Sequence, residues 1–144
     1  MRSVLVVEDS VSARAFVRAV LESPEFAAKN GGCEVLEATS GFDAMRMLPR
    51  GPYDLIITDI NMSDINGLEL VHFIRKSAHH AKTPLLIISS LGAPEDVARG
   101  LALGADVYLA KPFTSVQLAD ACARLLDAAR RHAAHPSEPP SSGA

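Results

Sequence analysis

Short apolar runs alternate along the chain with segments whose apolar residues recur at helical spacing. Five such runs predict β-strands: VLVV (4–7), CEVLEA (33–38), DLIITD (54–59), PLLIIS (84–89) and DVYLA (106–110). Several of them carry aliphatic residues at neighbouring positions rather than at every second one. This is typical of parallel strands that are covered by helices on both faces. The pattern therefore favours a buried parallel sheet.

Five helices are predicted to follow these strands one by one. The first is marked by Ala13, Phe16, Val17, Val20 and Leu21, which recur at the spacing of one helical face. The others are marked by Gly41, Ala44, Met45 and Leu48; by Leu70, Val71 and Ile74; by residues 94–103; and by Leu118, Cys122, Leu125, Leu126 and Ala129. Strict alternation of strand and helix predicts an α/β fold, a doubly wound five-stranded parallel sheet with five helices.

Size and composition narrow the class of protein. The 144 residues suit one folded domain, placed at 1–132, and the Pro- and Ser-rich end predicts a disordered tail at 133–144. A formal net charge of −3 gives no indication of direct nucleic-acid or membrane binding. The N-terminal apolar run, Val4 to Val7, is too short for a signal peptide or a membrane span, so a cytoplasmic location is expected.

The cysteines and histidines are interpreted as residues without a functional role. Cys33 and Cys122 lack metal-ligand spacing, and both are expected to pack in the interior. The five histidines, which include the pair His79 and His80, are expected to face solvent.

Polar residues stand where four of the predicted strands end. These residues are Glu8 and Asp9 after the first strand, Asp59 in the third, Ser89 in the fourth and Lys111 after the fifth. Ligands of doubly wound sheets bind at the carboxyl ends of the strands, so these side chains are expected to gather at one edge. Three converging carboxylates raise one another's pKa unless a cation intervenes, and such oxygen ligands suit Mg²⁺.

This set of groups suits phosphoryl transfer, which depends chiefly on positioning and on charge stabilisation. Asp59 can attack phosphorus and become an aspartyl phosphate. Lys111 would hold one phosphoryl oxygen as a point charge, and Ser89 would donate a hydrogen bond to another. Mg²⁺ would neutralise charge on the incoming phosphoryl group.

Four ordered motifs, VLVVEDS, LIITDINMSDINGLEL, PLLIIS and GADVYLAKPF, make the chain resemble the receiver domain of two-component response regulators. The likeness covers roughly residues 2 to 130 and is closest to the single-domain, chemotaxis-type regulators. It implies a flavodoxin-like sheet with strand order 2-1-3-4-5. It also implies that a histidine kinase or a histidine phosphotransfer protein phosphorylates Asp59, and that the chain is a signalling protein rather than an enzyme.

The resemblance further implies the ligands of the metal. Glu8 and Asp9 would bind Mg²⁺ together with Asp59, and Asn61 would contribute its backbone carbonyl. A phosphohydrolase of the haloacid dehalogenase type, which also uses an aspartyl phosphate, is the weaker alternative. Its nucleophile motif usually has a second aspartate two residues on, where this chain has Asn61.

A conformational switch is implied in the same way. Ser89 and Tyr108 would form the switch pair, and Lys111 would sense the phosphoryl group. Ser90 could take the place of Ser89, and Tyr108 could instead be an aromatic residue of an edge strand. The Lys111–Pro112 peptide bond is expected to be cis, an isomer that proline makes accessible.

The first predicted helix has residues off its apolar stripe, namely Val11, Arg14, Ala15 and Arg18. Val11 and Ala15 are four positions apart, so they share a face of the helix. A small apolar patch beside the acidic edge suits a helical phosphodonor. These four residues are therefore predicted to dock the kinase or the phosphotransfer protein.

The output is expected to be a population shift at the face formed by the fourth helix, the fifth strand and the fifth helix. Val97, Leu101 and Tyr108 are the predicted contacts for a downstream protein, which the sequence does not identify. A monomer or a weak dimer linked to phosphorylation is expected.

The extent of the natural protein is a separate question. We expect a stand-alone regulator without a DNA-binding output domain. The alternatives are the receiver part of a longer regulator, in which the tail begins a linker, and a receiver-like interaction module that is not phosphorylated. The acidic pair, Asp59 and Lys111 argue against the last of these.

Overall fold

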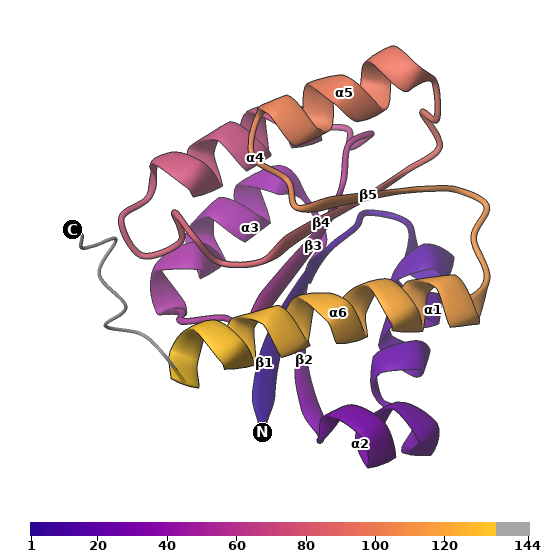
Figure 1. Cartoon of the computed structure of the whole chain (residues 1–144). Helices are drawn as coiled ribbons and strands as arrows, with labels where there is room; N and C mark the ends of the chain where they lie inside the picture. Colours follow the sequence, from indigo (N-terminus) through magenta and orange to yellow (C-terminus); the bar gives the residue numbers. More distant parts are fainter. Residues whose placement is uncertain (135–144) are drawn as a thin grey trace.

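A five-stranded parallel sheet forms the centre of the molecule (Figure 1), and its strand order is β2-β1-β3-β4-β5. The computed structural model describes residues 1–134, with side chains as far as residue 128. The strands are β1 (Arg2–Val7), β2 (Cys33–Ala38), β3 (Leu55–Asp59), β4 (Leu85–Ser89) and β5 (Val107–Ala110). All five predicted strands are present, and the predicted strand order is confirmed.

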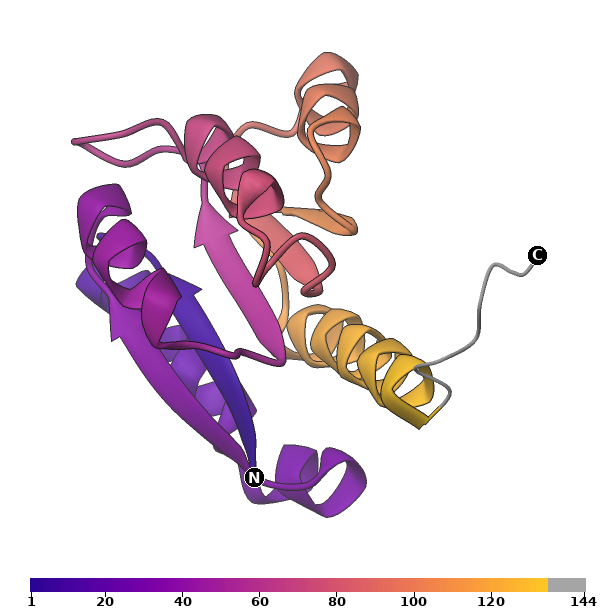
Figure 2. The same ribbon diagram turned by 90° about the vertical axis from the view of Figure 1, so that its left-hand side faces the viewer.

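Helices cover both faces of the sheet (Figures 1 and 2). They are α1 (Val11–Leu21), α2 (Pro24–Asn30), α3 (Gly41–Met47), α4 (Gly67–Lys76), α5 (Pro94–Ala102) and α6 (Ser115–Ala134), with a 3₁₀ turn, η1, at Leu48–Arg50. α1, α2 and α6 pack on one face, and α3, α4 and α5 lie on the other. The described residues thus contain six α-helices, one more than predicted.

The additional helix is α2, between α1 and β2. Its N-cap is Ser23, whose hydroxyl accepts a hydrogen bond from the backbone N–H of Phe26, and Pro24 occupies the first turn. Phe26 is the one buried residue of this helix. A helix with a single buried position has no repeating apolar stripe, so the spacing of apolar residues did not predict α2.

Two of the three inner strands, β3 and β4, are buried along their whole length. Parallel pairing places Asp59 opposite Ile88 and Ser89 opposite Ala110, so the carboxyl ends of β3, β4 and β5 lie side by side. Burial on both faces by helices explains the continuous apolar runs. This arrangement presents the strand-end residues at one edge of the sheet.

Some predicted burial states are wrong. Phe16, predicted on the core stripe of α1, is partly exposed, and its ring centroid lies 5.9 Å from that of Phe113. His80, predicted to face solvent, is buried, and its Nε2 lies 2.8 Å from the carbonyl oxygen of Leu48. His72 and His79 are exposed as predicted.

The cysteines behave as packing residues. Cys122 is fully buried on α6, and burial raises the pKa of its thiol to about 12. Cys33 is partly buried and packs against the same cluster. Both thiols are free.

α6 continues to Ala134, two residues past the predicted domain boundary, and residues 135–144 of the predicted tail lie outside the described part. No helix in residues 1–134 combines the length and the apolar character that a membrane span requires.

Candidate functional site

Three carboxylates converge at the carboxyl edge of the sheet. Glu8, Asp9 and Asp59 each offer an oxygen, and these oxygens all lie within 4.8 Å of one another. Glu8 is 0% exposed and Asp59 is 4% exposed, whereas Asp9 faces solvent. Burying carboxylates so close together costs free energy unless a cation or donors compensate the charge.

Lys111 supplies the compensating cation. Its Nζ lies 3.0 Å from Oε1 of Glu8 and 3.2 Å from Oδ2 of Asp59. Burial lowers the pKa of Lys111, but the hydrogen bond to Glu8 and the charges of both carboxylates outweigh burial, so the pKa lies above its ordinary value. Lys111 therefore keeps its charge between the two buried acids. The Lys111–Pro112 bond that follows is cis, as predicted.

Asp59 is oriented by the backbone that follows it. Its Oδ1 accepts hydrogen bonds from the N–H of Ile60 at 2.7 Å and of Asn61 at 3.3 Å. The start of α4 lies against this turn, where Gly67 donates its N–H to the carbonyl of Ile60 at 2.8 Å. A Cβ at Gly67 would lie 2.2 Å from the carbonyl oxygen of Asp59, so only glycine fits.

Glu8 is fixed on both carboxylate oxygens. Oε2 accepts the N–H of Ser10 at 3.0 Å, and Oε1 faces Lys111. Burial, assisted by the nearby charge of Asp59, raises the pKa of Glu8 against the opposing effects of the hydrogen bonds from Ser10 and Lys111.

The carboxylate of Asp9, by contrast, has no hydrogen-bond partner among the residues described. It is the carboxylate of the three that is open to a ligand.

Ser89 and Tyr108 are connected through the loop that follows β4. The buried Oγ of Ser89 accepts the N–H of Leu91 at 3.0 Å, and the hydroxyl of Tyr108 donates to the carbonyl of Leu91. The ring of Tyr108 lies against Gly100 of α5, where an added Cβ would come within 2.9 Å of it. Asn61 uses its side-chain amide to bond Ser90 Oγ at 3.3 Å. That side-chain contact was not predicted.

The predicted docking residues of α1 fall into two groups. Val11 is 72% exposed and Ala15 is exposed, as a docking surface requires. Arg14 and Arg18 form ion pairs with Glu37 of β2, at 3.1 and 2.6 Å, and their side chains are 14% and 41% exposed. On the other predicted surface, Leu101 is exposed, while Val97 and Tyr108 are half-buried.

Asp64, in the loop after β3, was missed by the sequence analysis. Its carboxylate accepts the backbone N–H groups of Gly41 and Phe42, at 3.1 and 2.9 Å, and so caps α3 from another loop. These hydrogen bonds, together with that from Ile65, lower the pKa of Asp64 to about 2. Local sequence offers no sign of this contact, because the bonded groups are more than 20 positions apart.

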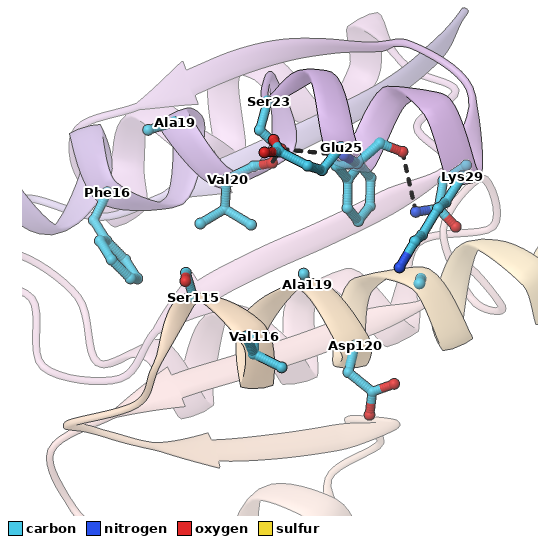
Figure 3. Close-up of a pocket in the computed structure, with 13 residues that line it drawn as sticks. Phe16, Ala19, Val20, Ser23, Glu25, Lys29, Ser115, Val116, Ala119 and Asp120 are labelled. Atoms are coloured by element: carbon cyan, nitrogen blue, oxygen red, sulfur yellow. Dashed lines mark hydrogen bonds between the residues drawn. The ribbon is translucent and has the colours of Figure 1, made fainter.

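A groove of about 680 Å³ lies on the face of the sheet that carries α1, α2 and α6 (Figure 3). In Figure 3, Phe16 and Val20 point from α1 toward α6, and Lys29 reaches from α2 in the same direction. None of the strand-end residues described above lines this groove. The converging carboxylates and the groove are therefore separate features.

The chain matches the family model of the response regulator receiver domain over residues 4–123. It is 39% identical to the gliding motility regulatory protein of Myxococcus xanthus over 123 residues, which are 85% of this chain and 15% of that protein. It is 33% identical to the cell cycle response regulator CtrA of Brucella ovis, over 94% of this chain and 53% of that protein. The chain thus spans about half, or less, of the length of these curated relatives.

Solved structures give the same likeness. The chemotaxis response regulator CheY4 of Vibrio cholerae superposes with a TM-score of 0.75 and is 32% identical, over 87% of this chain and 98% of that one. The receiver domain of the Francisella response regulator 1452 gives a TM-score of 0.75 at 28% identity, over 91% and 98% of the two chains.

Proposed function

The chain belongs to the response regulator receiver domain family, and on this premise we propose that Asp59 accepts a phosphoryl group from a histidine kinase or a histidine phosphotransfer protein. The observation that carries the proposal is the placement of Asp59. Its buried carboxylate lies within hydrogen-bonding distance of Lys111 and next to the open carboxylate of Asp9. A buried carboxylate, a cation and an open carboxylate therefore meet at one point, which supports the proposal.

The proposed transfer needs little covalent chemistry from the protein. A carboxylate oxygen of Asp59 attacks phosphorus, the bond from phosphorus to the histidine nitrogen of the donor breaks, and the electron pair stays with the departing imidazole. Lys111 is placed to neutralise one phosphoryl oxygen, because its Nζ already contacts Asp59. The N–H groups of Ile60 and Asn61 hold the attacking carboxylate in place. Positioning and charge are the main requirements of such a transfer.

The acidic residues fit a divalent cation. Hard cations such as Mg²⁺ prefer oxygen ligands and keep part of their water, which suits a site with one exposed and two buried carboxylates. We propose that Asp9 and Asp59 are ligands, that Glu8 supports them and that the carbonyl of Asn61 contributes. When bound, Mg²⁺ supplies positive charge that stabilises the phosphoryl oxygens during transfer.

The proposed switch runs through Leu91. Ser89 holds the N–H of Leu91 and Tyr108 holds its carbonyl, so the two predicted switch residues share one loop residue. If Ser89 turns its hydroxyl toward a phosphoryl group on Asp59, it releases Leu91, and the hydroxyl of Tyr108 loses a fixed partner. The surface of α5, β5 and α6, with Val97 and Leu101, would then change for a downstream protein.

The proposed docking surface for the phosphodonor rests on Val11 and Ala15. Both are exposed on α1 beside the acidic edge, and neither packs in the core. Arg14 and Arg18 are paired with Glu37, so Val11 and Ala15 are the apolar part of the predicted surface. We propose the chain as a signalling switch and not as a turnover enzyme; its stand-alone status stays a prediction.

Beryllofluoride, which mimics a phosphoryl group, tests the proposed function. Amide signals of Ser89, Tyr108 and Lys111 should shift in the wild type when beryllofluoride and Mg²⁺ are added, and should not shift in Asp59→Asn. Equal shifts in both proteins, or none in the wild type, would contradict the proposal.

A further inference from the structure

Arg14 of α1 reaches the backbone of the acidic turn. Its Nη1 donates a hydrogen bond to the carbonyl oxygen of Glu8 at 2.9 Å, and its Nε donates to Oε1 of Glu37 at 3.1 Å. The Arg14 side chain is 14% exposed, so these contacts are largely removed from water. The contacts differ from those of a solvated surface arginine.

The carbonyl that Arg14 holds belongs to the peptide unit between Glu8 and Asp9. A peptide unit is planar, so fixing its oxygen fixes the direction in which the chain enters Asp9. The Asp9 carboxylate has no hydrogen-bond partner among the residues described, so the region it can reach depends on the position of the backbone that carries it. Arg14 therefore restrains the backbone at the point where the chain enters Asp9.

β2 supports this contact from the other side. The carbonyl of Ala38 accepts the N–H of Glu8 at 3.1 Å, and the preceding residue, Glu37, holds the guanidinium of Arg14. One end of β2 therefore fixes both the amide and, through Arg14, the carbonyl of Glu8. The hydrogen bond from Arg18 and that from Arg14 lower the pKa of Glu37, so this support stays charged at neutral pH.

We propose that Arg14 is a positioning residue, which holds the Glu8–Asp9 peptide so that the Asp9 carboxylate stays beside Asp59 for a divalent cation, and that Glu37 orients Arg14. The inference rests on the proposed function, because it concerns the same acidic edge. Arginine suits this role because its planar group presents donors in fixed directions, whereas the ammonium of a lysine is a point charge without that fixed geometry.

Arg18 provides a matched control. It pairs with the same Glu37 at 2.6 Å and with Glu22 at 3.1 Å, but among the residues described it is Arg14, and not Arg18, that donates to the Glu8 carbonyl. Replacing either arginine with glutamine removes one positive charge near the acidic edge. By Coulomb's law that loss alone favours binding of a cation. A weaker Mg²⁺ affinity in Arg14→Gln therefore cannot come from the loss of charge.

The test titrates Mg²⁺ into the full chain of the wild type, Arg14→Gln, Arg14→Lys and Arg18→Gln, with the Asp59 and Asn61 amide signals as the readout. We expect about tenfold weaker Mg²⁺ affinity in both Arg14 variants, as for other residues that support metal ligands, and affinity within about twofold of wild type in Arg18→Gln. The Asp9 amide signal of the metal-free protein should move in the Arg14 variants alone. Melting temperatures of the four proteins separate a loss of positioning from a general loss of stability.

Two results would overturn the inference. Wild-type Mg²⁺ affinity in Arg14→Lys would show that the Glu8 carbonyl needs no guanidinium, and an equal loss in Arg18→Gln would show that only the ion pair with Glu37 matters. If Arg14→Gln does not fold, the Mg²⁺ affinity of Arg14→Lys, which keeps the charge, serves as the test of the inference. Failure of the wild type itself to bind Mg²⁺ would instead count against the proposed function.

Discussion

Lys111 and Asp59 lie 52 positions apart in the sequence, yet Lys111 Nζ and Asp59 Oδ2 are 3.2 Å apart at the edge of the sheet. Parallel pairing of β3 with β4 and of β4 with β5 sets this distance. The same ammonium contacts the fully buried Glu8, so one cation serves two buried acids. The stability of the domain and its proposed chemistry therefore depend on the same group.

Replacing Lys111 with methionine should destabilise the metal-free protein. Glu8 and Asp59 would remain buried without their cation, and the free energy of unfolding should fall by about 2 kcal/mol, less than for a fully buried pair because Lys111 is partly exposed. Urea unfolding in EDTA, followed by circular dichroism, measures this loss. Mg²⁺ should restore more stability to Lys111→Met than it adds to the wild type. The exposed Lys82→Met serves as the control, and an equal loss there would contradict the account.

The cap that Asp64 places on α3 should depend on pH. The folded pKa of about 2 lies below the ordinary value of 3.8, so the charged carboxylate stabilises the fold above pH 3.8. This contribution is lost as the pH falls through about 2. Asp64→Asn should therefore melt at a lower temperature than the wild type at pH 7, and the two melting temperatures should converge as the pH approaches 2. A difference that stays constant from pH 7 to pH 2 would refute this role.

Gly100→Ala should displace the ring of Tyr108. The added Cβ would lie 2.9 Å from Tyr108 Cδ2 and 2.9 Å from Ile87 Cδ1, so side chains or α5 must move. Overpacking of this kind costs about 1–3 kcal/mol. Thermal unfolding measures the cost, and aromatic NMR signals of Tyr108 report the displacement. Ala98→Ser, at an exposed position of the same helix, should change neither the thermal stability nor the Tyr108 signals. Unchanged Tyr108 signals in Gly100→Ala would contradict the prediction and indicate that α5 shifts instead.

Val11→Glu and Ala15→Glu should separate protein donors from small ones. A charge on either exposed residue would oppose apolar docking of a helical phosphodonor but would not touch the acidic edge. Transfer from a phosphorylated kinase or phosphotransfer protein should fall at least about tenfold, a difference of about 1.4 kcal/mol in the transition state. Phosphorylation by acetyl phosphate should not change. Ala28→Glu, on an exposed position of α2, is the control, and equal loss with both donors would disprove docking at this surface.

The sheet could be predicted because its signal is local and strong. β3 and β4 are buried on both faces, and their apolar runs end at Asp59 and Ser89, which also fixes the edge at which the polar residues meet. Lys111 follows β5 in the same way. The positions where the strands end were thus enough to predict that these side chains gather at one edge, while their roles stay predictions.

Other features depend on contacts that no local pattern records. Arg14 was predicted as a docking residue because it lies off the apolar stripe of α1; its hydrogen bonds to Glu37 and to the Glu8 carbonyl, which leave its side chain 14% exposed, were not predicted. His80 was expected to be exposed but is buried. Its ring N–H donates to the carbonyl of Leu48, 32 positions away, and this hydrogen bond compensates for the loss of water around the ring. Such partners become visible only when the elements are packed together.

Site-resolved phosphorylation tests the central claim most directly. The wild type and Asp59→Asn are incubated with acetyl phosphate, with and without Mg²⁺, and the modified residue is identified by mass spectrometry of the peptides. The account predicts one phosphoryl group on Asp59 of the wild type, formed only with Mg²⁺, and none in Asp59→Asn. Modification of another residue, undiminished modification of Asp59→Asn or no modification of the wild type would contradict it.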